Sequence, residues 1–184
     1  MPRSKALRLP VWLICLYPAV AAAVGGGEAV GIHKPEYNTN YAEPEQVGEQ
    51  ALQLPAYPKD SDLIGFYTGP RASNHFYIDK NSLSVGKDGI VRYTLVIKTS
   101  GGATNISYEG IRCADQEFKI YATGNADGTW AINRMSDWRP IENKQINGYH
   151  AALNHNFFCP LYNPIHSAEE GLDALRRGKH PLVP

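Results

Sequence analysis

The chain has 184 residues, a length that suits one folded domain with tails. Its 18 Lys and Arg residues balance its 18 Asp and Glu residues, and this balance argues against a nucleic-acid-binding surface. Hydrophobic residues make up 43% of the chain, so composition predicts an ordinary globular core rather than a disordered or membrane-embedded protein.

Residues 1–23 have the three parts of a secretory signal peptide. Three basic residues precede a short apolar core at 11–20, and the small residues at 19–23 suit signal peptidase. The core is too short for a membrane span, which takes about 20 apolar residues. Ile14 stands where a lipoprotein signal needs a small residue before Cys15, so we expect no lipid. The sequence therefore predicts an exported protein, periplasmic or secreted, without a transmembrane span in the mature chain.

The composition of residues 24–62 predicts a flexible lead. This stretch holds a run of three glycines, four prolines and no hydrophobic period. We expect the folded part to begin near Leu63. The predicted organisation is an α+β domain over residues 63–164, followed by a C-terminal helix and tail over residues 165–184.

Short β-rich runs separated by turn residues predict an antiparallel meander of about six strands. The runs start with residues 63–67 and 76–79 and end with residues 129–133. The central pair is a hairpin over residues 90–113. Its loop is expected at Gly101-Gly102, because a two-residue turn needs positive φ angles that glycine adopts freely.

This two-residue loop fixes the two faces of the hairpin. It puts Leu95 opposite Tyr108 on an apolar face. The other face is polar, and there Glu109 lies diagonal to Arg92, within reach of a surface ion pair.

Gly110 interrupts the second strand of the hairpin. We expect a bulge there, which would turn Ile111 and Cys113 toward the buried face. A plain glycine packed beneath Tyr93 is the alternative.

A hydrophobic stripe predicts a helix over residues 148–159. Its members, Tyr149, Leu153 and Phe157, recur every four residues, and Pro160 ends the helix. We expect this helix to cover the apolar face of the sheet.

A second, short helix is predicted over residues 168–177. Ser167 is placed as its N-cap, and Glu170 three residues later suits a capping box. Gly178 suits the position just past the C-terminal end of the helix.

Cys113 and Cys159 are the two cysteines left after leader removal. An even cysteine count in an exported chain favours a disulfide, which would tie the covering helix to the central strand. A pair of zinc ligands is the alternative, although neither cysteine belongs to a Cys-x-x-Cys pair.

No catalytic motif stands out. The sequence has no phosphate loop, no nucleophile elbow and no His-Glu-x-x-His, and we predict no catalytic residue, cofactor or metal. The candidate surface site therefore consists of polar residues on the predicted sheet and helix: Asp79, Arg92, Glu109 and His150. Their ordinary interpretations are a turn-initiating Asp, two ladder charges and a solvated helix histidine.

Two pairs of adjacent aromatic residues lie on predicted strands. Phe66-Tyr67 and Phe76-Tyr77 must each point one ring to either face of the sheet. One ring of each pair belongs to the core, and the other can anchor a partner or a sugar ring. Packing at the sheet edge is the alternative.

Several motifs recur in an order that resembles a known family. They include Leu63-Ile64-Gly65-Phe66-Tyr67, Phe76-Tyr77-Ile78-Asp79, Tyr108-Glu109-Gly110-Ile111-Arg112-Cys113 and Phe158-Cys159-Pro160. The run over about residues 55–160 resembles the cryptic neisserial protein (CNP-one-like) family of small exported proteobacterial proteins. That resemblance implies an envelope location, and it implies no activity. A weaker likeness, to surface-adhesin domains of the protein E type, supports a binding role by analogy.

Taken together, the sequence predicts a non-catalytic domain that binds an envelope protein or a cell-wall component. The alternative is a periplasmic hydrolase acting on cell-wall or sugar substrates. A cleft that brings two of the candidate residues within hydrogen-bonding reach would favour the hydrolase. An aromatic or apolar surface would favour binding.

Overall fold

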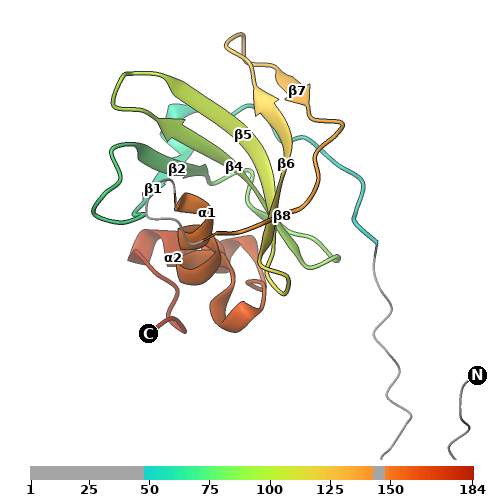
Figure 1. Ribbon diagram of the computed structural model, residues 1–184, viewed down its shortest axis with the longest axis vertical. Helices are drawn as coiled ribbons and strands as arrows, with labels where there is room; N and C mark the ends of the chain where they lie inside the picture. The colour runs from blue at the N-terminus through green and yellow to red at the C-terminus, as the bar shows by residue number, and fades with distance from the viewer. Residues whose placement is uncertain (1–47, 143–147) are drawn as a thin grey trace, which may run out of the picture. The chain divides into compact units, whose positions relative to one another are not determined.

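The computed structural model describes residues 48–142 and 148–184. In these residues eight strands form one antiparallel sheet, with the helices packed on one side of it (Figure 1). The strand order is β1-β2-β4-β5-β6-β7, while the short β3 pairs with β4 and the short β8 pairs with β6. The predicted α+β class and antiparallel meander are confirmed. No helix within the two described ranges has the length and hydrophobicity to cross a membrane.

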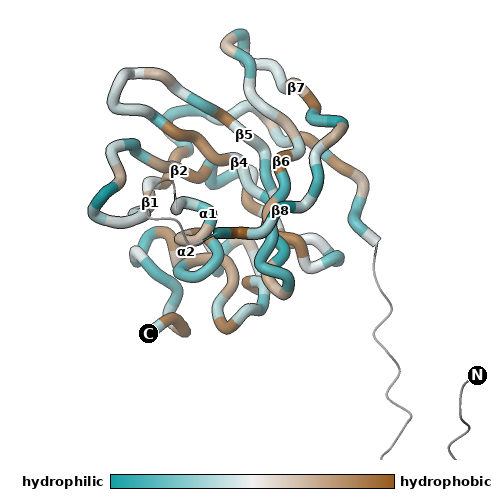
Figure 2. The backbone as a smooth tube through the Cα atoms, in the orientation of Figure 1, coloured by the Kyte–Doolittle hydropathy of each residue, from teal (hydrophilic) through white to brown (hydrophobic). Residues whose placement is uncertain are grey.

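The strands are β1 (Leu63–Phe66), β2 (His75–Asp79), β3 (Ser84–Val85), β4 (Ile90–Lys98), β5 (Thr104–Arg112), β6 (Glu117–Gly124), β7 (Trp130–Ile132) and β8 (Arg139–Pro140). The helical elements are the 3₁₀ turn η1 (Asp60–Asp62), α1 (Tyr149–Ala152), the π-helix η2 (Leu153–Phe158), the 3₁₀ turn η3 (Pro160–Tyr162) and α2 (Ala168–Arg177). Hydrophobic segments lie along the central strands and in the helical layer, whereas loops are more hydrophilic (Figure 2).

The central hairpin forms, but its loop is one residue longer than predicted. Lys98 pairs with Thr104, and the Thr99 N–H donates to the carbonyl of Ala103 at 2.8 Å, which leaves a three-residue loop. Gly102 takes a φ of +86°, as the last residue of such a loop requires. The predicted two-residue loop is therefore wrong. A one-residue slip moves every side chain of β5 to the opposite face.

The slip exchanges Tyr108 and Glu109 between the two faces. Glu109 pairs with Tyr93 and lies on the helix-covered face, which we call the inner face. Tyr108 pairs with Thr94 on the outer face. The predicted surface ion pair between Glu109 and Arg92 is wrong, since the two side chains lie on opposite faces of the sheet.

The expected bulge at Gly110 is also wrong. The register shift lies between β5 and β6, where Tyr121 is the extra residue of β6. A Cβ atom on Gly110 would lie 2.9 Å from Cε2 of Tyr121, so this glycine makes room for the Tyr121 ring rather than for Tyr93. Ile111 and Cys113 are buried, as expected, but because of the three-residue loop.

The predicted covering helix is present over residues 149–158, with a change of type halfway. It continues from α1 into the π-helix η2, and the Cys159 N–H donates to the Asn154 carbonyl five residues back at 3.0 Å. The wider turn brings both Phe157 and Phe158 into the core, at 1% and 0% exposure. The predicted stripe contained only the first of these two rings.

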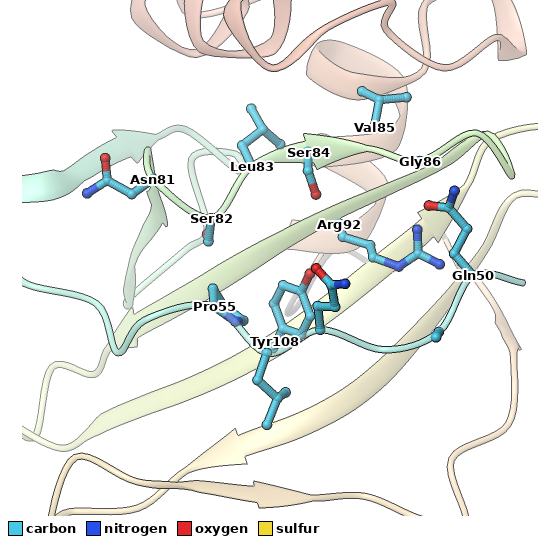
Figure 3. A pocket seen from close by; sticks show the side chains of 13 residues that line it. Gln50, Pro55, Asn81, Ser82, Leu83, Ser84, Val85, Gly86, Arg92 and Tyr108 are labelled. Atoms are coloured by element: carbon cyan, nitrogen blue, oxygen red, sulfur yellow. The ribbon is translucent and has the colours of Figure 1, made fainter.

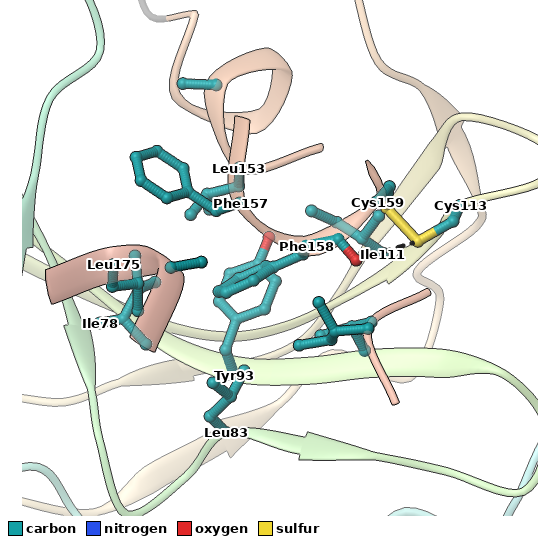
Figure 4. Close-up of a cluster of buried hydrophobic side chains, with 14 of the residues drawn as sticks. Ile78, Leu83, Tyr93, Ile111, Cys113, Leu153, Phe157, Phe158, Cys159 and Leu175 are labelled. Carbon is teal, nitrogen blue, oxygen red and sulfur yellow. Dashed lines mark hydrogen bonds between the residues drawn. A yellow bond between two sulfur atoms is a disulfide. The ribbon is translucent and has the colours of Figure 1, made fainter. Parts of the chain in front are cut away.

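Cys113 and Cys159 form the predicted disulfide, with Cα atoms 5.3 Å apart. The zinc-ligand alternative is therefore wrong. The disulfide lies at one side of the main core, between β5 and the helical layer (Figure 4). The side chains around it are large and apolar, among them Ile78, Tyr93, Ile111, Leu153, Phe157, Phe158 and Leu175.

The C-terminal helix α2 has its predicted bounds and caps. The Glu170 N–H donates to the Ser167 hydroxyl at 3.2 Å, and Gly178 takes a φ of +83° at the C-terminal end. Only half of the capping box forms, because the Glu170 carboxylate accepts instead from the His166 N–H at 2.6 Å.

Part of the predicted flexible lead packs on the outer face. Residues 49–58, which we call the strap, run along the side of the sheet away from the helices (Figure 1). Their contacts are described below, and they place the start of packed chain at least as early as Glu49. The predicted signal peptide and residues 24–47 of the lead lie outside the described residues.

Candidate functional site

Glu109 is the centre of a buried polar cluster on the inner face. Its side chain is 1% exposed and accepts from the Ser107 hydroxyl at 2.6 Å and from the Tyr93 hydroxyl at 3.2 Å. Burial raises the pKa of the Tyr93 phenol well above its ordinary value, and the neighbouring Glu109 carboxylate adds to this shift. The phenol therefore stays protonated and remains a donor to Glu109.

His150 joins this cluster from the first turn of α1. Its Nε2 atom lies 2.8 Å from Oε2 of Glu109. The imidazole stacks on the Phe118 ring of β6, with centroids 3.6 Å apart, and the residue is 9% exposed. His150 is thus enclosed by Phe118 and Glu109. The Glu109–His150 contact holds α1 on the sheet and leaves little room for a substrate.

The other two candidate residues lie elsewhere. Asp79 ends β2 at 3% exposure, and its Oδ1 accepts from the Asn81 N–H at 3.2 Å. Burial raises the pKa of Asp79, and the charge of nearby Asp62 raises it further. Arg92 lies on the outer face at 7% exposure. The structure therefore brings Glu109 and His150 together and separates both from Arg92, and none of the four is a freely exposed surface residue.

A cleft of about 630 Å³ lies on the outer face, between the strap and the segment from Asn81 to Gly86 (Figure 3). Tyr108 and Arg92 project into it from β5 and β4. Most of its polar groups are uncharged amides or hydroxyls. The full lining is Gln50, Ala51, Gln53, Leu54, Pro55, Asn81, Ser82, Leu83, Ser84, Val85, Gly86, Arg92 and Tyr108.

Arg92 is the one charged residue among the described residues that line this cleft, and its charge is already paired. Its two terminal nitrogens donate to the Asp88 carboxylate at 3.1 and 2.6 Å, and the Asp88 side chain is 1% exposed. Burial acts to raise the pKa of Asp88, but the bonds from Arg92 and from the Gln50 and Ile90 N–H groups outweigh it and lower the pKa to about 2. The pair stays ionised at neutral pH and gives the cleft no net charge.

Gly86 allows this pair to form so close to the backbone. A Cβ atom there would overlap Oδ1 of Asp88 and approach Nη1 of Arg92 to 2.6 Å. The glycine is thus required by a side-chain pair that lies directly against it. In the sequence Gly86 and Asp88 looked only like parts of a turn.

The strap is anchored at its start by Glu49. Its carboxylate accepts from Lys119 Nζ at 3.1 Å and from Trp138 Nε1 at 3.3 Å. Burial acts to raise the pKa of Glu49, but the nearby Tyr121 hydroxyl and the Lys119 ammonium outweigh it and lower the pKa below its ordinary value. Arg112 packs on the Trp138 ring, with its guanidinium carbon 4.2 Å from the ring centroid, and is itself paired with Asp115 and Glu117.

No group of three or more His, Cys, Asp and Glu side chains in residues 48–142 and 148–184 is arranged to hold a metal ion. Glu170 comes nearest, since His166 and His180 both bond to its carboxylate. Each imidazole takes a different oxygen, at 3.1 and 2.9 Å. The group is a structural clamp on the C-terminal tail.

Comparison with known proteins gives two matches. The model of a family described as CNP1-like matches residues 42–176, more than half of the chain. Cryptic neisserial protein 1 from Neisseria gonorrhoeae is 27% identical over 142 residues, which cover 64% of this chain and 70% of that protein. No solved structure gives a significant match.

Proposed function

We propose, from the finding that the chain belongs to the CNP1-like family, that it is an exported, non-catalytic binding domain. The ligand that we propose is a neutral, hydroxyl-rich molecule of the saccharide class, held in the cleft between the strap and residues 81–86. The predicted signal peptide supports export to the cell envelope, where such ligands are abundant.

The observation that carries this proposal is the chemistry of the cleft lining. Gln50, Gln53 and Ser84 offer uncharged donors and acceptors, and such groups can bond to sugar hydroxyls. The Tyr108 side chain also lines the cleft but is only 4% exposed, so the polar groups carry the proposal. A free ionic ligand is disfavoured, because Arg92 is already paired with Asp88 at 2.6 Å.

The hydrolase alternative has less support. Glycoside hydrolysis ordinarily needs two carboxyl groups beside the scissile bond. The described lining of the cleft contains no Asp, Glu or His. Glu109, the carboxylate nearest to a histidine partner, is 1% exposed on the opposite face of the sheet.

The proposal is tested by titrating the purified chain with a panel of neutral oligosaccharides. Calorimetry and NMR measure the binding. Ser84→Ala and Gln53→Ala should each weaken binding by about five- to tenfold, the cost of one lost hydrogen bond. Ser73→Ala is the matched control, since Ser73 is exposed and lies outside the cleft lining. Binding that none of the cleft variants changes would contradict the proposed site.

The same samples separate binding from hydrolysis. Chromatography after overnight incubation should recover each oligosaccharide unchanged. A shortened product that appears with the unaltered chain would favour the hydrolase and exclude a purely binding role.

A further inference from the structure

The strap crosses a strip of aromatic rings on the outer face. The strip, which we call the aromatic strip, is Tyr108 of β5, Tyr121 of β6 and Trp130 of β7. Ring centroids are 5.9 Å apart for Tyr108 and Tyr121 and 6.4 Å apart for Tyr108 and Trp130. Leu54 of the strap packs against these rings, and the Tyr57 ring lies 5.3 Å from that of Trp130. The strap thus buries its apolar side chains on a preformed aromatic surface.

Two hydrogen bonds hold the strap to this surface. The Trp130 indole N–H donates to the Pro55 carbonyl at 3.0 Å, and the Tyr57 hydroxyl donates to the Asn125 carbonyl at 2.6 Å. Among the described backbone–backbone hydrogen bonds, none joins residues 49–58 to the sheet. The strap is therefore not an added strand. It is held through side chains, as a bound peptide would be.

The strap sequence has the features of a ligand for such a surface. Leu54-Pro55-Ala56-Tyr57-Pro58 places two prolines three residues apart. Proline fixes its own φ and keeps the preceding residue extended, so this segment favours the polyproline II conformation. Aromatic grooves that recognise proline-rich segments exploit this pre-organised conformation.

The strap can leave without opening the main core. Its apolar contacts belong to the small outer cluster around Tyr108 and Tyr121, whereas the disulfide and the two helices belong to the core on the inner face. Two polar anchors lie at the start of the strap: Glu49 accepts from Lys119 at 3.1 Å, and the Gln50 N–H donates to Asp88 at 2.8 Å. A segment held this way opens more readily than a core strand does.

We propose that the aromatic strip is a binding site for an extended, proline-containing peptide of a partner protein, and that the strap occupies this site in the free chain. The strap itself gives the ligand pattern, which is aliphatic-Pro-x-aromatic-Pro. The positive charge of Lys119 favours an acidic residue five positions before the aliphatic one, as Glu49 precedes Leu54. This site shares Tyr108 and the strap with the saccharide cleft, but the proposal does not depend on the ligand of that cleft.

The test uses a fluorescein-labelled peptide with the sequence of residues 48–59 and the full chain carrying Leu54→Ser and Tyr57→Ala, which frees the strip. We expect the variant to bind the peptide at least about tenfold more tightly than the unaltered chain, in which the tethered strap competes at a high effective concentration. Fluorescence anisotropy measures both affinities. A peptide with alanine at both proline positions should bind the variant at least about tenfold more weakly.

Substitutions in the strip then locate the site. Trp130→Phe keeps a ring and removes the N–H that bonds to Pro55, so peptide binding should weaken by about fivefold. Tyr67→Phe is the matched control, since Tyr67 is an exposed aromatic residue of another region, at 65% exposure.

Two outcomes would overturn the proposal. One is a variant that is folded by circular dichroism and does not bind the peptide. The other is a variant that dimerises in sedimentation experiments without binding the peptide, which would assign the strip to the strap of a second copy. If the chain carrying Leu54→Ser and Tyr57→Ala does not fold, a chain carrying Glu49→Ala and Tyr57→Ala replaces it, and the expected results are the same.

Discussion

His150 Nε2 lies 2.8 Å from Oε2 of Glu109, and this contact joins the first turn of the helical layer to the middle of the sheet. The carboxylate has further donors in Ser107 and Tyr93, so it is buried with a full set of partners. Removing this carboxylate would leave its hydrogen-bonding partners in the interior unpaired, and unpaired buried polar groups are costly.

Replacing Glu109 should therefore destabilise the domain strongly. We expect Glu109→Ala to lower the free energy of unfolding by about 3–5 kcal/mol, because it leaves the buried Tyr93 and His150 and the half-buried Ser107 without their common partner. Urea denaturation measures the change. Asp115→Ala is the control, since Asp115 pairs with Arg112 at the surface at 3.4 Å and should cost less than about 1 kcal/mol. Equal losses of unfolding free energy in the two variants would show that the buried cluster stabilises the domain no more than a surface ion pair does.

Asp88 should make stability depend on acid pH. Its pKa is lowered in the folded chain from 3.8 to about 2, so ionised Asp88 stabilises the fold above pH ~4. That contribution, about 2 kcal/mol, is lost as the pH falls from about 4 to about 2. The stability difference between the unaltered chain and Asp88→Asn should therefore shrink across this range.

Denaturation at several pH values checks this expectation. Asp60→Asn is the matched control, because Asp60 is 86% exposed in its pair with Lys98 and should show a much smaller difference. A difference for Asp88→Asn that stays constant down to pH ~2.5 would contradict the ion pair.

The glycine at position 110 should be far less replaceable than the one at 101. Gly110→Ala would press its methyl group against Tyr121 at 2.9 Å and Ile90 at 3.0 Å, so we expect a loss of about 1–3 kcal/mol. At Gly101 the nearest atom is Thr99 Oγ1 at 3.9 Å, and alanine there should be close to neutral. Thermal unfolding of the two variants compares them. A tolerated Gly110→Ala would mean that the Tyr121 ring does not lie over this position.

The disulfide should stabilise the fold through the helical layer. Cys113→Ala or Cys159→Ala should lower the free energy of unfolding by about 2–4 kcal/mol, and the double variant should cost about the same, because all three lack one bond. Thiol titration of the oxidised, unfolded chain should find no free thiol at either position. Two reactive thiols in protein isolated from an oxidising compartment would contradict the bond.

The predicted signal peptide implies that the mature protein is shorter than the full chain and carries no lipid. The intact mass of protein collected from the cell envelope should correspond to a start near Ala22 or Val24, as the small residues before these positions indicate. Retention of residues 1–21 in that protein, or a lipid adduct on Cys15, would contradict the predicted signal peptide.

Local signals in the sequence were enough for several elements of the fold. The stripe of Tyr149, Leu153 and Phe157 predicted the covering helix, and Ser167 with Gly178 predicted the ends of α2. An even number of cysteines after a predicted signal peptide predicted the disulfide. Each of these signals depends on residues close in sequence or on a count of cysteines, so none of them requires knowledge of the rest of the fold.

Tertiary structure alone decided the register of the central hairpin, and with it the candidate sites. Ser100-Gly101-Gly102 suits a two- or a three-residue loop, and the choice depends on which face of β5 the helices cover. That choice buried Glu109 and put Tyr108 on the outer face. The outer face in turn gave the strap its aromatic surface, since Tyr57 and Trp130 are far apart in sequence and meet only when the sheet has formed.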